Sequence, residues 1–300
     1  MPSMQRFSPW QGLALAAIGV LGFSGTLPAT RIAVADLGAV VVGLGRALVA
    51  ALLALVYLLV RGEPVPARRH WPSFAVIALT VVAGFPLLSA IVLTSSSASH
   101  AAVVVALAPA CTAILAVLRA GERPARSFWL GVALGLFGVC LYVFGASPDE
   151  PVGTDLGLLA AVLCVAIGYT EGARLSRELS GFCVISWSLV LSAPFVALVL
   201  AVSELPPIAQ VRPAAWLGFA YVSLVSMFAA FAAWYAGLAA AGISRGSQLQ
   251  LFQPFLSVLW ASLFLDEPVT PGLLGALCIC AAGVALAVRA RLEHVAVRAR

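Results

Sequence analysis

The chain has 300 residues, of which 62% are hydrophobic and 10% charged, and its formal net charge is +5. A soluble domain carries about 25% charged residues, so this composition excludes an ordinary soluble protein and favours one embedded in a membrane. Every basic residue is an arginine, and the arginines are spread over many short segments, which argues against a nucleic-acid-binding face.

Ten apolar stretches predict an all-α polytopic membrane protein with ten transmembrane helices. A bilayer core about 30 Å thick needs roughly 20 apolar residues per helix. The stretches do not alternate polar and apolar residues as lipid-facing β-strands do. In chain order, the predicted spans are 10–30, 37–60, 71–93, 100–118, 127–145, 156–173, 181–202, 214–238, 246–265 and 272–289.

The positions of the arginines predict how these spans are oriented. With the N-terminus in the cytoplasm, all but three of the 17 arginines fall on the cytoplasmic side; Arg31 and Arg212 fall outside, and Arg46 falls within the second span. Because arginine-rich loops stay in the cytoplasm, both termini are predicted to be cytoplasmic. The alanine-rich, lysine-free composition is typical of GC-rich bacterial genomes, so we expect a multi-pass protein of the bacterial inner membrane.

The chain repeats one five-span unit at a fixed offset of 145 residues. The repeat is visible without a gap in the pairs Trp71 with Trp216, Pro109 with Pro254, and Glu122 with Glu267. Because five is odd, the second copy must enter the membrane from the opposite side. We therefore predict two inverted five-helix repeats, residues 10–145 and 154–290, followed by a basic cytoplasmic tail at 291–300. Inverted repeats are typical of alternating-access carriers, which bind their solute between the two copies.

The first span has a second interpretation as a secretory signal, because Ala33, Val34 and Ala35 resemble a small-residue cleavage site. Its removal would leave nine spans and would break the pairing of Leu13 with Leu158. An uncleaved first helix is therefore favoured.

The ends of the two halves carry a family resemblance. The sequences ALAPACTAILAVLRAGERP and LFQPFLSVLWASLFLDEPVT each place a proline thirteen residues before a glutamate, and GLGRALVAALLALVYLL has an arginine near its start. With these motifs the chain resembles a ten-helix member of the drug/metabolite transporter superfamily, in the EamA-domain exporter branch, over about residues 10–290. The resemblance implies a solute exporter with a cavity between its halves, lined mainly by the first, third, fourth, sixth, eighth and ninth spans.

Polar residues within the spans are the candidates for contacting a solute. On the ninth span, one helical stripe is formed by Gln250, Gln253, Ser257 and Trp260. Amides are costly in hydrocarbon, so this stripe is expected to face the cavity, although bonding between neighbouring helices is an alternative. Further candidates are Ser24, Tyr169 and Trp234. Ser24 lies in a loosened segment that could kink without contacting solute, and Trp234 could belong to an interfacial aromatic belt.

A second group of residues is predicted to have structural or gating roles. Pro109 and Pro254 interrupt the hydrogen bonding of their helices, and Glu122 and Glu267 close the same two spans. Arg46 lies about ten residues into the second span, where an unpaired charge costs on the order of 3 kcal/mol. It needs carbonyls, an acidic partner or the cavity. We favour a structural or gating role for it over direct binding of a substrate carboxylate.

These features predict a secondary transporter that exports amino acids or related small metabolites, with amphiphilic drugs or nucleobase-like solutes as an alternative. A membrane-embedded lipid-processing enzyme is a candidate of another class. It would need a convergent catalytic set, but the chain has three histidines, no HExxH and no GxSxG motif. A receptor or scaffold that does not transport is disfavoured by the inverted repeat.

No cofactor or metal is indicated, because the six cysteines form no CxxC pair. The expected partners are a small solute and the lipid bilayer. Protons are a candidate coupling ion, but the centres of the spans hold no carboxylate, so facilitated diffusion stays open. A homodimer also stays open, because the glycine-rich faces of the fifth and tenth spans could pack within one chain or between two.

Overall fold

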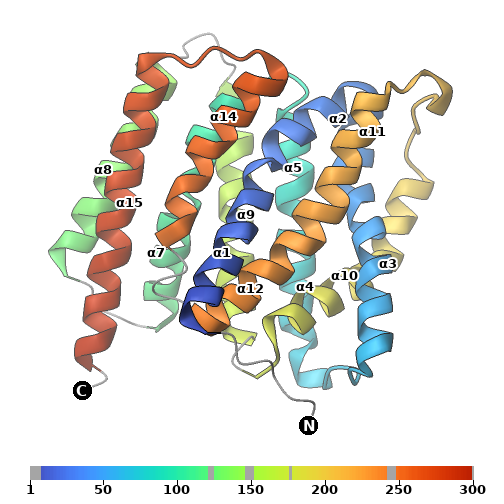
Figure 1. Ribbon diagram of the computed structural model, residues 1–300, viewed down its shortest axis with the longest axis horizontal. Coiled ribbons are helices and arrows are strands. Elements are labelled where there is room, and N and C mark those ends of the chain that lie inside the picture. The colour runs from blue at the N-terminus through green and yellow to red at the C-terminus, as the bar shows by residue number, and fades with distance from the viewer. Residues whose placement is uncertain (1–7, 121–124, 146–151, 176–177, 242–247, 299–300) are drawn as a thin grey trace.

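The computed structural model describes residues 8–120, 125–145, 152–175, 178–241 and 248–298, and its elements in these ranges are helices (Figure 1). The first half contains α1 (Pro9–Ser24), α2 (Thr26–Val40), η1 (Val41–Gly45), α3 (Arg46–Arg61), η2 (Arg68–His70), α4 (Trp71–Ile77), η3 (Ala78–Gly84), α5 (Phe85–Val92), α6 (Ala98–Val105), α7 (Ala108–Ala120) and α8 (Arg126–Gly145). The second half contains α9 (Val152–Leu175), α10 (Gly181–Ala201), η4 (Ile208–Gln210), α11 (Pro213–Ala220), η5 (Tyr221–Ala229), α12 (Ala230–Ala241), η6 (Gln248–Phe252), α14 (Gln253–Leu265) and α15 (Pro271–Arg298).

The predicted ten-span organisation is confirmed within these ranges. Seven helical stretches are long and apolar enough to cross a membrane, and Leu249–Leu265 and Pro271–Ala287 add two shorter ones. The longest stretch, Trp10–Arg61, contains two spans, because Gly38 interrupts it with a φ of +75° and a ψ of 162°. No atom lies within 4 Å of the place where a Cβ would stand on Gly38, so the backbone conformation is what requires glycine there.

The two halves run in opposite directions and share their irregularities. In Figure 1, the chain rises from α4 to α5 in the third span, whereas it descends from α11 to α12 in the equivalent eighth span. Both spans contain a π-helix, η3 at Ala78–Gly84 and η5 at Tyr221–Ala229, and the repeat offset superimposes most of one on the other. Since π-helical turns are frequent at functional sites, these matched segments direct attention to the space between the halves.

Small residues let the helices approach closely. A Cβ on Gly131 would stand 2.5 Å from the backbone nitrogen of Ala287, and a Cβ on Gly138 would stand 2.9 Å from that of Cys280. The glycine-rich faces of the fifth and tenth spans, α8 and α15, therefore pack against each other inside the chain. These faces are not available to a second copy.

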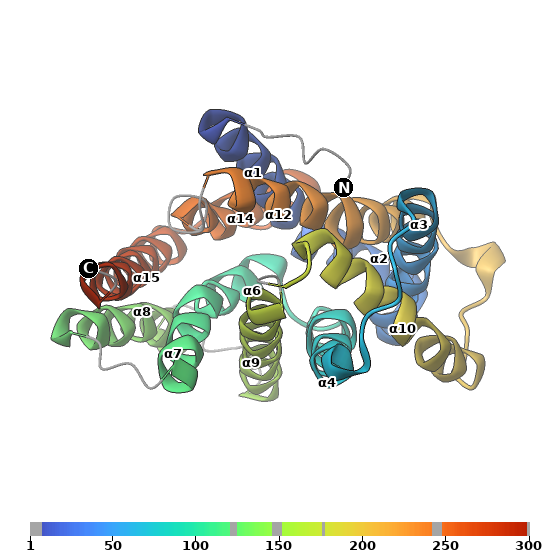
Figure 2. The same cartoon turned by 90° about the horizontal axis from the view of Figure 1, so that it is seen from below.

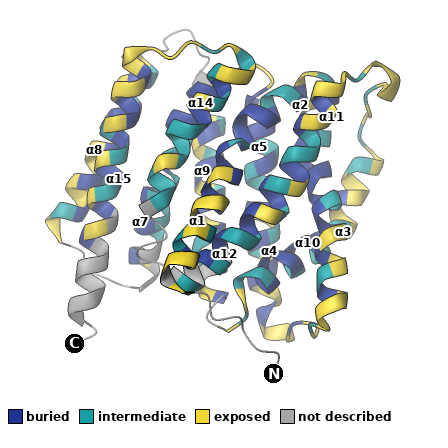
Figure 3. Cartoon of the chain, viewed as in Figure 1, coloured by how far each residue is buried: buried dark blue, intermediate teal, exposed yellow. Residues whose placement is uncertain are grey.

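The helices form two rows that can be followed in Figure 2. The helices α1, α12 and α14 lie along one side, and α4, α7 and α9 lie along the other. The pair α8 and α15 occupies one short end, and α3 and α10 occupy the opposite end. Exposed residues follow the outer faces of α3, α8 and α15, and they include large apolar side chains such as Leu59 and Phe137 (Figure 3). A lipid environment accounts for this apolar outer surface.

Candidate functional site

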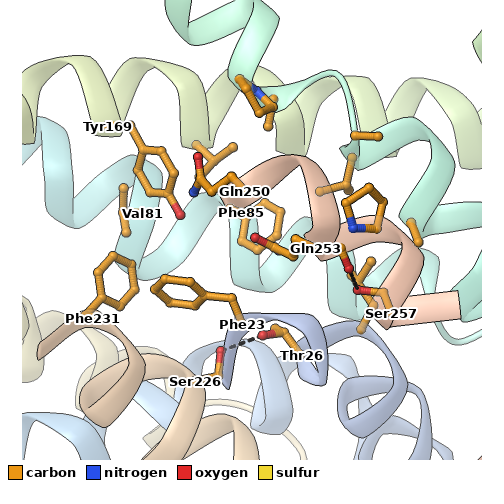
Figure 4. A pocket seen from close by; sticks show the side chains of 18 of the residues that line it. Phe23, Thr26, Val81, Phe85, Tyr169, Ser226, Phe231, Gln250, Gln253 and Ser257 are labelled. Atoms are coloured by element: carbon orange, nitrogen blue, oxygen red, sulfur yellow. Dashed lines mark hydrogen bonds between the residues drawn. The ribbon is translucent and has the colours of Figure 1, made fainter. Parts of the chain in front are cut away.

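A central cavity lies between the two repeats, and both contribute to its walls (Figure 4). The volume of the cavity that the centres of water molecules can reach is about 80 Å³, which is room for several waters. The walls include residues of the first, third, fourth, sixth, eighth and ninth spans, the spans that the family resemblance implies. Representative lining residues, in that order, are Phe23, Phe85, Pro109, Tyr169, Phe231 and Gln253.

Seven of the residues singled out in the sequence line this cavity. They are Gln250, Gln253, Ser257, Tyr169, Arg46, Pro109 and Pro254. Figure 4 shows the amides of Gln250 and Gln253 projecting from η6 and the start of α14 into the space bounded by Phe23, Phe85 and Tyr169. Neither side-chain amide has a hydrogen-bond partner within the described part of the chain. As far as the described residues go, both amides are therefore available to a solute.

Ser24 and Trp260 lie behind the cavity wall, where they join α14 to the end of α1. The indole nitrogen of Trp260 donates to Ser24 Oγ over 2.8 Å, and Ser24 Oγ donates to the Leu21 carbonyl over 2.7 Å. The Ser257 hydroxyl lies 2.7 Å from the Ser24 carbonyl and 3.0 Å from that of Gln253. Ser24 is fully buried, and neither it nor Trp260 is part of the cavity lining. In this arrangement the two side chains support the wall of the cavity without lining it.

Trp234 is also outside the lining. It is buried, and its ring makes an edge-to-face contact with Phe23 at a centroid distance of 6.5 Å. Its close approach to α1 depends on Gly19, since a Cβ there would stand 2.9 Å from the Trp234 backbone. The side chain therefore packs inside the bundle. The sequence had suggested a place on the cavity wall or in an interfacial aromatic belt.

Two hydroxyl contacts near the break at Gly25 were not among the predicted site residues. Thr26 Oγ1 and Ser226 Oγ lie 2.7 Å apart on the cavity wall and link the first and eighth spans. The Tyr221 hydroxyl donates to the Gly22 carbonyl over 2.9 Å, and a Cβ on Gly25 would stand 2.5 Å from that hydroxyl. The sequence signal for these contacts was Gly25 between the hydroxyl-bearing residues Ser24 and Thr26, because such a glycine marks a place where a helix can open.

Arg46 is buried on the cavity wall without a complete set of partners. Its side chain is 3% exposed, and its Nε and Nη1 atoms make no hydrogen bond within the described residues. It is the first residue of α3, directly after the π-helix η1. Since a π-turn holds an extra residue, η1 changes which face of the span Arg46 occupies and directs it towards the cavity.

The upper end of the molecule in Figure 1, which holds residues 93–98 and 265–271, joins the two repeats through charged groups. The Glu267 carboxylate accepts hydrogen bonds from the amides of Ala98 and Ser99 at 2.7 and 2.8 Å, which caps the start of α6. A helix N-terminus has unsatisfied amides and a positive dipole end, so a carboxylate stabilises it. Beside it, His100 Nε2 lies 2.8 Å from Asp155 Oδ1. The equivalent Glu122 lies outside the described residues.

The lower end, where α3 meets α4 and α9 meets α10, also connects the repeats. Arg174 donates to the Ser73 hydroxyl over 2.8 Å and pairs with Glu171 on its own helix. Arg69 pairs with Glu178 over 2.8 Å, but both side chains are exposed. Exposed pairs contribute little to stability, so Arg174 to Ser73 is the stronger contact at this end, and it is part-buried like the contacts at the upper end.

Comparison with known proteins agrees with this architecture. The model of the EamA-like transporter family matches residues 10–144 and 153–289. A solved crystal structure superposes with a TM-score of 0.65 over 92% of this chain and 97% of that chain, at 19% sequence identity. At this identity the likeness shows the fold.

Two relatives cover most of the chain. The uncharacterised transporter YdeK of Bacillus subtilis (strain 168) is 44% identical over 255 residues, which are 84% of this chain and 88% of that protein. The uncharacterised protein PA1977 of Pseudomonas aeruginosa is 28% identical over 290 residues, or 95% and 96% of the two chains. Because the family model covers both repeats and YdeK is similar over most of its length, the chain belongs to the EamA-like transporter family and is a membrane transporter.

Proposed function

We propose that this transporter exports amino acids or related small metabolites across the bacterial inner membrane by alternating access, with both termini in the cytoplasm. The observation that carries the proposal is the central cavity between inverted repeats, in which the amides of Gln250 and Gln253 have no protein partner among the described residues. Such groups can hold the polar backbone atoms of an amino acid, while the aromatic walls hold its side chain.

Pro109 adds an acceptor at the same place. Proline has no backbone N–H, so Pro109 cannot donate to the carbonyl of Val105, four residues earlier in its span, and Val105 lines the cavity. Gln250, four residues before Pro254, lies in the 3-10 helix η6, where a carbonyl accepts from the residue three positions on. A carbonyl relieved of a helical partner is suited to an ammonium group. A zwitterion would therefore find the two amides and the Val105 carbonyl on the cavity walls.

Alternating access requires the halves to move relative to one another. The π-helices η3 and η5 and the break at Gly25 are the segments where helical hydrogen bonding is already irregular. In this proposal they absorb the bending, while the contacts of Glu267 and His100 at the upper end break when the cavity opens on that side.

Amphiphilic drugs or nucleobase-like solutes are the second candidate substrates. Phe23, Phe85 and Phe231 face the cavity together with Tyr169, so much of the wall can stack on a flat ring. This aromatic wall suits a large amphiphile as well as the side chain of an aromatic amino acid. The two candidates differ in whether the solute must carry an amino-acid backbone.

Counterflow uptake into proteoliposomes tests the proposal. Vesicles loaded with one unlabelled amino acid are diluted into the same labelled compound, with protein-free vesicles as the control. Concentrative uptake of one amino-acid class is expected, and an imposed pH gradient that changes its rate would identify protons as the coupling ion. Uptake of labelled nucleobases or amphiphilic cations, with none for any amino acid, would contradict amino-acid export and favour the second candidate.

A further inference from the structure

Arg46 is a buried cation that the protein itself leaves incompletely bonded. Its side chain is 3% exposed, it lines the central cavity, and its Nε and Nη1 atoms have no hydrogen-bond partner in the described ranges. No carboxylate is among the lining residues that the structure describes. An unpaired charge inside a membrane protein is costly. A ligand that pairs with Arg46 only while it is bound would account for this arginine.

Arg31 shows how a structural arginine in this fold is satisfied. It lies in α2, just beyond the predicted first span, and its Nη1 donates to the carbonyls of Leu93 and Thr94 over 2.6 and 2.9 Å. Those two bonds join α2 to the residues that follow α5. Arg46 makes no comparable connection with Nε or Nη1. A purely structural role would be expected to use these donors, as it does at Arg31.

We infer that Arg46 binds the anionic group of the transported solute, and that the solutes are monocarboxylates with an apolar or aromatic remainder, including amino acids. A guanidinium presents paired donors that match the two oxygens of a carboxylate. A phosphate monoester carries close to two negative charges, whereas Arg46 is the single cation among the described lining residues. The inference rests on the proposed transport through this cavity and names the solute class that it takes.

The solute class can be tested on the unaltered protein. Purified protein in detergent is titrated calorimetrically with L-phenylalanine, 3-phenylpropionate and phenylethylamine, which carry both charged groups, the carboxylate alone and the ammonium alone. Saturable binding of L-phenylalanine and 3-phenylpropionate is expected, with phenylethylamine at least tenfold weaker. Equal or tighter binding of the amine would overturn the inference, and so would the failure of both carboxylates to bind.

Variants then assign the carboxylate to Arg46. Arg46→Gln should weaken 3-phenylpropionate binding at least tenfold, and Arg46→Lys, which keeps the charge, should weaken it less. The midpoint of thermal unfolding should stay the same or rise in Arg46→Gln, because a costly unpaired charge is removed. Arg31→Gln is the matched control: it should lower the midpoint and leave the affinity within twofold.

The opposite pattern would overturn the role of Arg46. A lower midpoint or a failure of Arg46→Gln to fold would mark a structural arginine, as would an unchanged affinity for 3-phenylpropionate. Failure of the proposed function is distinguishable from this result. Binding that depends on Arg46 without counterflow of any amino acid would refute amino-acid export alone, whereas normal counterflow in Arg46→Gln would refute only the carboxylate site.

Discussion

The upper end of the molecule and the central cavity both bury polar side chains, but they differ in how these groups are paired. At the upper end, Glu267 holds two backbone amides of α6 and His100 contacts Asp155, so groups of one repeat bond those of the other. In the cavity, Arg46 and the amide of Gln253 face space that the protein does not fill. Polar groups that bond each other hold helices together, whereas unpaired ones are available to a solute. Substitutions at the upper end should therefore act on stability, and those in the cavity on transport.

The largest effect is expected at Glu267. Replacing it with alanine removes the acceptors for the amides of Ala98 and Ser99, so that the start of α6 keeps the Ser97 hydroxyl, which accepts from the His100 amide, but loses its carboxylate cap. A lost cap of this kind costs about 2 kcal/mol. The midpoint of thermal unfolding in detergent should fall by several degrees.

A matched control separates this contact from a general effect of charge. Glu204→Ala removes an exposed carboxylate in the loop after α10 and should leave the midpoint unchanged. If Glu267→Ala unfolds at the wild-type temperature, the cap does not hold the upper end together, and the contrast with the cavity would lose its main support.

Gln253→Ala should have the next largest effect, on transport rather than stability. Loss of one hydrogen bond of roughly 1.4 kcal/mol to the solute corresponds to about a tenfold lower counterflow rate at low solute concentration. The unfolding midpoint should not change, because the amide bonds nothing within the described residues. Gln210→Ala, in the exposed helix η4, is the control. Normal transport by Gln253→Ala would assign the amide to packing.

Asp155→Asn should have a smaller effect on stability. Asparagine keeps one oxygen near His100 Nε2 but loses the charge, which corresponds to a loss of about 1 kcal/mol. The measurement is a double-mutant cycle of unfolding free energies with His100→Gln. A coupling energy between the two substitutions is expected, and strictly additive effects would show that the pair does not connect the repeats.

The spans and the inverted repeat could be predicted from the sequence because apolar length and residue register are local properties. Pro109 and Pro254 occupy equivalent positions, each the second residue of its helix, α7 and α14. The break at Gly38 falls inside the predicted second span, since a left-handed glycine carries no apolar signal. The pairing of Glu267 with the amides of Ala98 and Ser99 could not be predicted. Its partners lie more than 160 residues away in the chain and are backbone atoms with no side-chain signature.

The candidate site was predictable in part, for a reason that lies in helix geometry. Gln250 lies in the 3-10 helix η6, and Gln253, Ser257 and Trp260 lie in the α-helix α14. The first three line the cavity as the stripe predicts, whereas Trp260, further along α14, reaches Ser24 on the neighbouring span instead, a contact between segments far apart in the chain. The orientation of Arg46 likewise depends on the π-helix η1, and α- and π-helices have no distinguishing apolar pattern.

Asp36→Asn should have the smallest effect, although its ion pair has good geometry. The Arg212 guanidinium donates to both oxygens of Asp36 at 2.7 to 3.1 Å, which joins the first repeat to the second. The Arg212 side chain is 68% exposed, and water and salt weaken such a pair. The unfolding midpoint should equal that of the wild type at 150 mM salt, roughly physiological ionic strength, and fall slightly below it at 10 mM. A large loss at both salt concentrations would mean that a paired contact holds the upper end together even where it is exposed to water.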